Sequence, residues 1–240
     1  MSGKPEFTPT RWSLIAAVRG SDAARSREAM ETLCRSYWYP LYAYVRRSGH
    51  SHEESADLTQ EFFAHIIGKG LLTRADPERG RLRNFLLNAL QRFLRDEWRA
   101  QNRQKRGGGG AILSIDGATA EGLYAREPSH MDTPEKLYHR RWALTLLELT
   151  LSGLRDAYAQ QSKGELFDVL KPALTEEPDA ESATASGAKL GLTPGAVRVA
   201  VTRLRARFRQ RLLAEVAASM DVQTEAEVDE EIDALFRALG

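Results

Sequence analysis

Arginines are concentrated in residues 196–211, in a pattern that suits contact with a polyanion. The stretch holds six arginines and no acidic residue, a local charge of +6. An ordinary exposed helix mixes charge signs so that its side chains can pair, so an unmixed run favours a phosphate-rich partner. An apolar stripe with steps of three and four residues predicts the buried side of the same helix: Val197, Val201, Leu204, Phe208 and Leu212.

The residues just before this helix have the turn signals of a helix-turn-helix. A short helix can end at Gly191, Thr193 can cap the next helix, and Pro194 suits its first position. The second helix of such a motif enters the major groove, where its first residues meet base edges and later arginines meet phosphates. A solvated arginine-rich helix is the alternative. The expected duplex-binding residues are Thr193, Pro194, Gly195, Arg198, Thr202, Arg203 and Arg205.

A second basic segment, residues 79–106, combines a loop with a helix that carries aromatic residues. It holds nine lysines and arginines against two acids, a local charge of +7. Arginines can hold phosphates while loop residues and ring faces meet unstacked bases, which is the chemistry of single-stranded DNA binding. Alternatively, Phe85, Phe93 and Trp98 serve only as core residues. The candidate DNA-binding residues are Arg79, Arg81, Arg83, Asn84, Arg92, Arg95 and Arg99.

A third segment mixes acids with phenylalanines. Asp57, Glu61 and His65 recur at intervals of four and share one helix face. A helical metal site also needs ligands from a facing helix, and the neighbouring helices offer aromatics and arginines instead. A solvated acidic face and a protein-docking face remain open, and the adjacent phenylalanines favour docking. The candidate docking residues are Asp57, Gln60, Glu61, Phe62 and Phe63.

Helical spacing of apolar residues dominates the rest of the chain, and only residues 111–115 read as extended. Ser51 and Glu54 have the spacing of a capping box, and Pro40 predicts a kink or a break in its helix. The expected helices are 27–47, 53–67, 82–101, 135–160, 164–172, 180–190, 194–216 and one from about 225.

These elements predict an all-α protein with two small helical domains. Four consecutive glycines at 107–110 cannot hold a helix, since each costs about 1 kcal/mol relative to alanine. The sequence therefore places a flexible linker at 107–134, between a domain over 10–106 and a helix-turn-helix domain over 135–216. An acidic C-terminal helix, 221–240, follows.

Composition points to a cytoplasmic protein with no catalytic apparatus. The 240 residues carry a net charge of +1, and no apolar run is long enough for a membrane span or a signal peptide. The single cysteine, Cys34, excludes a disulfide framework. The glycine run lacks the Gly-Lys-Ser/Thr ending of a phosphate loop, and no Ser-His-Asp or Cys-His grouping has a catalytic context. We expect no enzymatic activity, no cofactor and no metal.

Acids gather at the C-terminal end, where residues 215–240 hold eight acids against Arg237, a local charge of −7. Such a tail can act as an intramolecular regulator that masks a basic surface, or simply as a small packing helix.

Together these segments resemble a bacterial sigma factor of the extracytoplasmic-function (ECF) class. Asp57-Leu-Thr-Gln-Glu-Phe-Phe63 resembles the family's D-L-x-Q-E-x-F signature. Leu190-Gly-Leu-Thr-Pro-Gly-Ala-Val-Arg198 is similar to the family's L-G-[ILM]-S-x-x-T-V-[KR] turn. The resemblance covers about 10–105 for the family's region 2 and about 136–216 for its region 4.

The resemblance implies partners for each surface. The acidic-aromatic helix would dock on the β′ clamp helices of core RNA polymerase, and region 4 would contact the β flap. Region 2 would hold promoter DNA at the −10 element, since Asp96 and Arg99 match the residues that end the −10-reading helix. The helix after the turn would read the −35 element. No membrane partner is expected.

The sequence departs from the family pattern at two places that matter for regulation and specificity. Glu54-Ser-Ala-Asp57 lacks the middle acid of the usual D-A-E-D arrangement. One hypothesis is that a kinase restores negative charge by phosphorylating Thr59 or Ser55, and an anti-sigma factor is the other regulator considered. Arg92 replaces a frequent asparagine of the −10-reading helix, so the −10 specificity is left open.

The predicted function is that of a sigma factor, which binds core RNA polymerase and directs promoter recognition and transcription initiation. The alternative is a stand-alone helix-turn-helix regulator that binds duplex DNA without polymerase. That alternative leaves the acidic-aromatic helix and the basic loop without a task. A third class is a helical metal enzyme that uses His52, Glu61 and His65.

Overall fold

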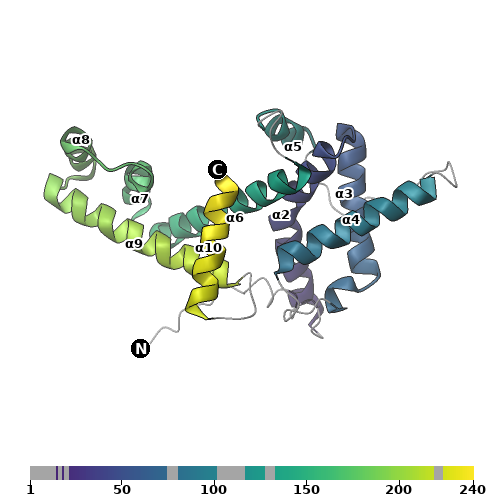
Figure 1. Ribbon diagram of the computed structural model, residues 1–240. Coiled ribbons are helices and arrows are strands. Elements are labelled where there is room, and N and C mark those ends of the chain that lie inside the picture. The colour runs from purple at the N-terminus through teal and green to yellow at the C-terminus, as the bar shows by residue number, and fades with distance from the viewer. Residues whose placement is uncertain are drawn as a thin grey trace. The chain divides into compact units, whose positions relative to one another are not determined.

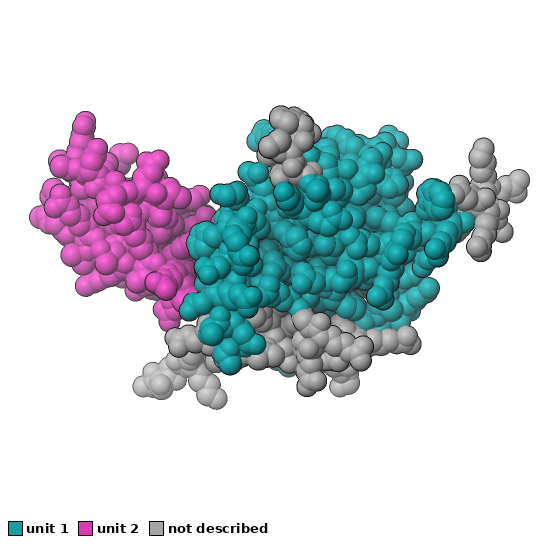
Figure 2. All heavy atoms as spheres, in the orientation of Figure 1, with its two compact units in different colours: residues 1–145, 216–240 teal, residues 146–215 magenta. Residues whose placement is uncertain are grey.

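The computed structural model describes Ile15, Val18 and residues 22–74, 81–101, 117–127, 133–218 and 224–240. Across these ranges the regular structure is helical and contains no strand, which confirms the all-α prediction (Figure 1). None of the helices in these ranges is long and apolar enough to cross a membrane. The chain forms two compact units, unit 1 (Met1–Thr145 with Val216–Gly240) and unit 2 (Leu146–Glu215), coloured separately in Figure 2.

Unit 1 is built around α2 (Ala23–Arg47), α3 (His52–Gly68) and α4 (Leu82–Gln101), with the short helix η1 (Leu71–Arg74) after α3. The predicted capping box starts α3: Ser51 Oγ accepts from the Glu54 N–H, and Glu54 Oε2 accepts from the Ser51 N–H. The apolar faces of the three helices meet in the core. Its buried members include Leu33, Tyr37, Leu41, Leu58, Phe62, Phe63, Ile66, Leu82, Leu86, Leu90 and Phe93.

The helix α2 continues through Pro40, so of the kink or break predicted there, the break is wrong. Proline removes one backbone hydrogen bond and crowds the preceding turn. The residues on both sides of it, Tyr37, Leu41 and Val45, are fully buried. Packing of these side chains offsets the local cost of the proline.

Part of the expected flexible linker is a helix docked on unit 1. This helix, α5 (Gly117–Tyr124), lies inside 107–134, and its Glu121 receives hydrogen bonds from Arg46 Nη2 (2.6 Å) and Tyr42 Oη (2.6 Å). The Arg46 hydrogen bond is the main cause that lowers the pKa of Glu121 to about 2. Glu127, just beyond the helix, pairs with Arg141. Because these charged partners lie far away in sequence, glycine content alone could not predict the docking. The glycines 107–110 and residues 111–115 lie outside the described residues.

Unit 2 contains the predicted helix-turn-helix. Part of α6 (Pro134–Gln160) is followed by α7 (Gly164–Leu170), η3 (Lys171–Leu174), α8 (Ala180–Leu190) and most of α9 (Pro194–Ala218). The domain boundary was expected at 135, but residue 135 belongs to unit 1. The two units divide between Thr145 and Leu146, within α6. The core of unit 2 consists of Leu154, Tyr158, Phe167, Leu170, Ala183, Val197, Val201 and Leu204.

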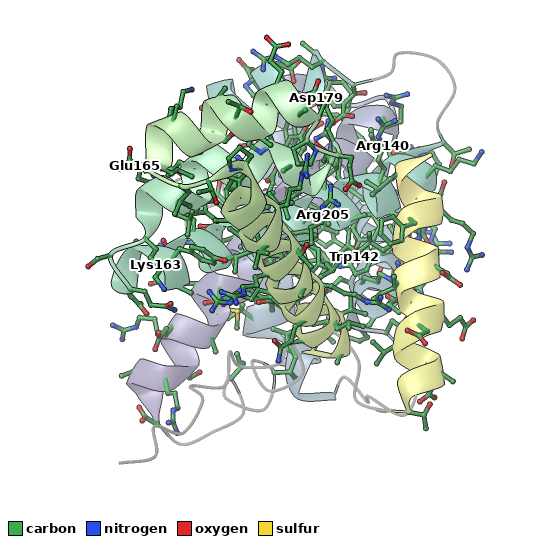
Figure 3. All side chains as sticks on the ribbon, turned by 90° about the vertical axis from the view of Figure 1, so that its left-hand side faces the viewer. Arg140, Trp142, Lys163, Glu165, Asp179 and Arg205 are labelled. Carbon is green, nitrogen blue, oxygen red and sulfur yellow. The ribbon has the colours of Figure 1, made fainter. Side chains whose placement is uncertain are left out.

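The turn between α8 and α9 follows the expected pattern of caps. Asp179 caps the start of α8 by accepting a hydrogen bond from the Ser182 N–H at 2.8 Å (Figure 3). Gly191 ends α8 in the left-handed conformation, with φ of 65°, which glycine adopts without steric cost. Thr193 Oγ1 then accepts from the Ala196 N–H at 3.2 Å. Local side-chain and backbone bonds therefore define both ends of the turn.

Replacing Gly187 by alanine is expected to destabilise unit 2. A Cβ atom there would lie 2.5 Å from the backbone oxygen of Leu192, which the turn holds in place. The overlap is expected to cost about 1–3 kcal/mol. At Gly195, by contrast, a Cβ meets nothing within 4 Å. Urea unfolding followed by circular dichroism should show Gly187→Ala less stable than wild type and Gly195→Ala at least as stable; equal stabilities would contradict the close approach.

Candidate nucleic-acid interfaces

The first half of α9 presents a polar, basic face. Six of the seven predicted duplex-binding residues are exposed, namely Thr193, Pro194, Gly195, Arg198, Thr202 and Arg203. Val199 lies on the same face with 51% of its surface exposed, an apolar contact that charge counting missed. Arg207 lies over the Tyr158 ring at 5.2 Å from its centroid. The buried stripe of Val197, Val201 and Leu204 sets the orientation of this face, as the spacing predicted.

Arg205, which is labelled in Figure 3, donates hydrogen bonds to backbone carbonyls elsewhere in unit 2. Its Nε donates to the Ala173 carbonyl at 2.9 Å and its Nη2 to the Glu176 carbonyl at 3.0 Å. Its Nη1 lies 3.2 Å from the Glu177 carboxylate. With its donors used in this way, Arg205 joins α9 to η3 and to the segment after it, and its predicted contact with DNA would need these bonds to break.

A second basic stripe runs along α4. The exposed residues Asn84, Arg92, Arg95 and Arg99 were expected there, and Asn88, which the sequence analysis did not single out, shares their face. Arg95 Nε donates to the Gln91 carbonyl at 3.2 Å. Asp96 is exposed as well and lies 3.8 Å from Arg99 Nη1. The stripe therefore combines amide groups, which can read base edges, with guanidinium groups that can hold phosphates.

The two arginines at the start of α4, Arg81 and Arg83, contact other residues of the same chain. Arg83 has only 6% of its surface exposed; its guanidinium lies 4.2 Å from the Trp142 ring centroid, and its Nη2 lies 2.8 Å from Glu231 Oε2. Arg81 Nη1 lies 2.8 Å from the same carboxylate oxygen. In this arrangement both guanidinium groups are paired with the Glu231 carboxylate. Arg79, the remaining candidate, lies outside the described residues.

The predicted docking residues on α3 divide into a surface set and a core set. Asp57 and Glu61 are exposed and Gln60 is partly exposed. Phe62 and Phe63 have 0% and 1% of their surfaces exposed, and their rings pack on each other, with Phe62 also against Phe93. Both rings are core residues in this structure, and they fix the orientation of the exposed Asp57 and Glu61 on the same helix.

An acidic groove runs between α3 and α4. It is a hollow of about 250 Å³, lined by His50, Glu54, Asp57, Leu58, Glu61, Leu94, Glu97 and Trp98. Trp98, expected in the core, is 68% exposed at this groove. The buried stripe of α4 runs through Leu86, Leu90 and Phe93, so position 98 falls beside the stripe. Trp98 lies five residues after the buried Phe93, a spacing that turns a helical side chain away from the buried face.

The charges of the groove favour a basic partner. Glu61 is partly shielded from water and faces Glu97 and Asp57, and these causes, burial first, raise the pKa of its carboxyl. A lysine or arginine from another molecule would relieve this repulsion and find an exposed indole beside it. The groove can therefore bind a basic, partly apolar protein surface.

The two residues considered for phosphorylation are not accessible. Ser55 and Thr59 each have 0% of their surfaces exposed. The Ser55 hydroxyl donates to the Ser51 carbonyl at 2.6 Å, and that of Thr59 donates to the Ser55 carbonyl at 2.7 Å. A kinase cannot reach either hydroxyl in this conformation, so the structure speaks against the phosphorylation hypothesis.

Two of the residues weighed for a metal site, His52 and His65, contact other side chains. His52 Nδ1 lies 2.8 Å from Tyr42 Oη, and the His65 ring packs edge-on against Phe93. Among the side chains that the structure describes, no group of three or more His, Cys, Asp or Glu residues is arranged to hold a metal ion.

Unit 1 is expected to lose stability as the pH falls from about 6.5 toward 4. Burial and the nearby Arg83 charge lower the pKa of His139 from 6.5 to about 4, so the folded protein disfavours its protonation. The unfolded chain takes up that proton first, which costs the folded state about 1–2 kcal/mol at pH 5. Urea unfolding at pH 7.5 and pH 5 should show this loss, and His139→Gln should reduce it. An unchanged pH dependence in the variant would contradict the assignment.

Comparison with known proteins assigns the chain to a family. A sequence model of the family described as "ECF sigma factor" matches residues 13–163, more than half of the chain. The match covers α2 to α6 and ends before the helix-turn-helix. No curated protein and no solved structure matches the chain significantly.

Proposed function

The chain belongs to the ECF sigma factor family, and on that premise we propose that its acidic groove docks on core RNA polymerase. The contact would be made by Asp57, Gln60 and Glu61 on α3, with Glu97 and Trp98 on α4. The β′ clamp helices are the proposed partner, and the cytoplasm the proposed place of action. The unrelieved carboxylates of the groove support a basic partner of this kind.

The stripe on α4 is proposed to hold the promoter strand at the −10 element. Asn84 and Asn88 would meet unstacked bases, while Arg92, Arg95 and Arg99 would hold phosphates. Their exposure on one face of a helix whose other face is core supports this assignment. No catalytic step is proposed, because strand opening can draw on the binding of unpaired bases.

The exposed start of α9 is proposed to read the −35 element as duplex. Arg198, Thr202 and Arg203 would enter the major groove, with Val199 available for a thymine methyl group. Contact of unit 2 with the β flap is proposed as well. Arg205 is left out of this surface because its donors are used within unit 2.

One observation carries the proposal: α4 separates an acidic groove from a basic stripe on the same helix. A regulator that binds duplex DNA alone needs a basic surface but has no use for the acidic groove. A protein that must hold polymerase and promoter together needs both surfaces within one rigid unit. The arrangement therefore favours the sigma factor over the stand-alone regulator.

Transcription in vitro tests the proposal. Core RNA polymerase, the purified chain and a fragmented genomic library should yield discrete run-off transcripts that are absent without the chain. A pull-down should recover core polymerase with the chain. Duplex binding without polymerase capture or specific transcripts would contradict the sigma factor and favour the stand-alone regulator.

A further inference from the structure

The acidic helix α10 (Glu225–Leu239) packs on the rest of unit 1 with one buried carboxylate, that of Glu231. Glu231 has 0% of its surface exposed, and its Oε2 lies 2.8 Å from both Arg81 Nη1 and Arg83 Nη2. Leu235, one turn further on, is also fully buried. The neighbouring acids Asp229, Glu230 and Asp233 are exposed. Glu230 Oε2 lies 3.9 Å from Arg81 Nη2, so Glu231 supplies the buried charge of the contact and Glu230 an exposed one.

The apolar contribution to this contact is centred on Leu235. Phe236, part of the apolar stripe of α10, is 56% exposed, and Val228, Ile232 and Leu239 are only partly buried. Burying charge is costly, as the raised pKa of Glu231 shows; burial raises it while Arg83 and Arg81 pull it down. An apolar contact of the same size would hold α10 equally well. The ionic contact differs from an apolar one because another anion can compete with Glu231 for Arg81 and Arg83.

A cavity beside the contact gives such an anion a route. It has a volume of about 550 Å³ and lies between the last turns of α10 and the starts of α4 and α6. Its walls include Arg83, Asn84, Lys136, His139 and Arg140, with Arg237 on the α10 side. A phosphate could enter this basic cavity and reach Arg83 before Glu231 has left it.

We propose that α10 is an intramolecular mask, in which Glu231 stands in for a DNA phosphate on Arg81 and Arg83. A carboxylate between two guanidinium groups occupies the position that a backbone phosphate would take. The helix must undock before the promoter strand binds these arginines. This inference rests on the proposed function, because it takes from it the assignment of region 2 to the −10 strand.

The mask lowers the DNA affinity of the free protein in proportion to its occupancy. Only the undocked fraction binds, so docking in nine of ten molecules would raise the apparent Kd about tenfold. Polymerase or promoter contacts that favour the undocked state would remove this penalty. While α10 is docked, the protein that is not bound to polymerase would bind non-specific DNA only weakly.

Removal of the Glu231 charge tests the mask. The experiment uses the full chain as wild type, Glu231→Gln and Asp229→Asn, with a fluorescein-labelled 20-nucleotide oligo-dT probe followed by fluorescence anisotropy at constant salt. Asp229→Asn is the matched control, because it makes the same charge change at an exposed site of the same helix. We expect Glu231→Gln to bind about tenfold tighter, equivalent to about 1.4 kcal/mol. Equal affinities for the two variants would overturn the proposal.

Two further measurements separate a failed mask from a failed function. The variant Arg92→Ala/Arg95→Ala removes cations of the α4 stripe that α10 does not engage, and it should weaken probe binding. If the double variant binds the probe more weakly but Glu231→Gln binds it no more tightly than wild type, only the mask is contradicted. If the double variant binds the probe as well as wild type does, the assignment of the α4 stripe to DNA, on which the mask rests, is contradicted. Hydrogen exchange gives an answer that needs no variant: probe binding should speed exchange in 225–239, and unchanged protection would overturn the mask.

Discussion

The double variant Asp57→Lys/Glu61→Lys is expected to lose binding to core RNA polymerase by at least about 100-fold, or about 2.7 kcal/mol. Both carboxylates line the acidic groove, where burial and then the charges of Glu97 and Asp57 raise the pKa of Glu61; a basic partner would relieve this repulsion. Reversing both charges would set lysines against that partner. Because the two side chains are polar and their helix is anchored by Phe62 and Phe63, the fold should persist.

The measurement is biolayer interferometry with immobilised core polymerase. Glu28→Lys/Asp156→Lys is the matched control, since it makes the same change in net charge at exposed positions away from the groove. We expect the control to bind within a few-fold of wild type. Similar losses in both double variants would mean that overall charge, and not the groove, governs the interaction.

Two neighbouring arginines of α9 are expected to give opposite results when each is replaced by alanine. Arg203 is exposed on the proposed duplex-binding face, so Arg203→Ala should weaken duplex binding by about 1–3 kcal/mol. It should also reduce the slope of log Kobs against log salt concentration by about 0.9, the value for one lost phosphate contact. Titrations at several salt concentrations measure both quantities.

Arg205→Ala should instead lower the stability of unit 2. Its guanidinium donates to the carbonyls of Ala173 and Glu176 and pairs with Glu177, and losing these bonds should cost about 1–2 kcal/mol. The salt dependence of duplex binding should stay unchanged at temperatures where unit 2 remains folded. A reduced slope with unchanged unfolding would show that Arg205 leaves its partners to contact DNA.

Features that depend on residues within a turn or two of each other could be predicted. The capping box of Ser51 and Glu54, the end of α8 at Gly191 and the start of α9 after Thr193 all match the structure. The buried stripe of α9 does as well. Caps and helical faces arise from contacts three or four residues apart, so sequence spacing carries them.

Individual side chains of the candidate sites were harder to assign. Phe62 and Phe63 lie next to the docking acids in sequence, yet they point into the core. Trp98 was expected in the core and is exposed. On a helix, neighbours in sequence point to different sides, so composition alone cannot say which of them a partner would meet.

The sequence by itself determined most of the helices, though not α5, together with the helix-turn-helix, the segregation of charge and, through its signatures, the family. Only the tertiary structure decided which arginines are available. Arg205 finds its backbone partners about 30 residues away, and Arg83 pairs with Glu231 across a separation of 148 residues. Such partners are chosen by how helices pack and not by local spacing. An arginine in the sequence is therefore only a donor, and the fold decides whether its ligand is DNA or the chain itself.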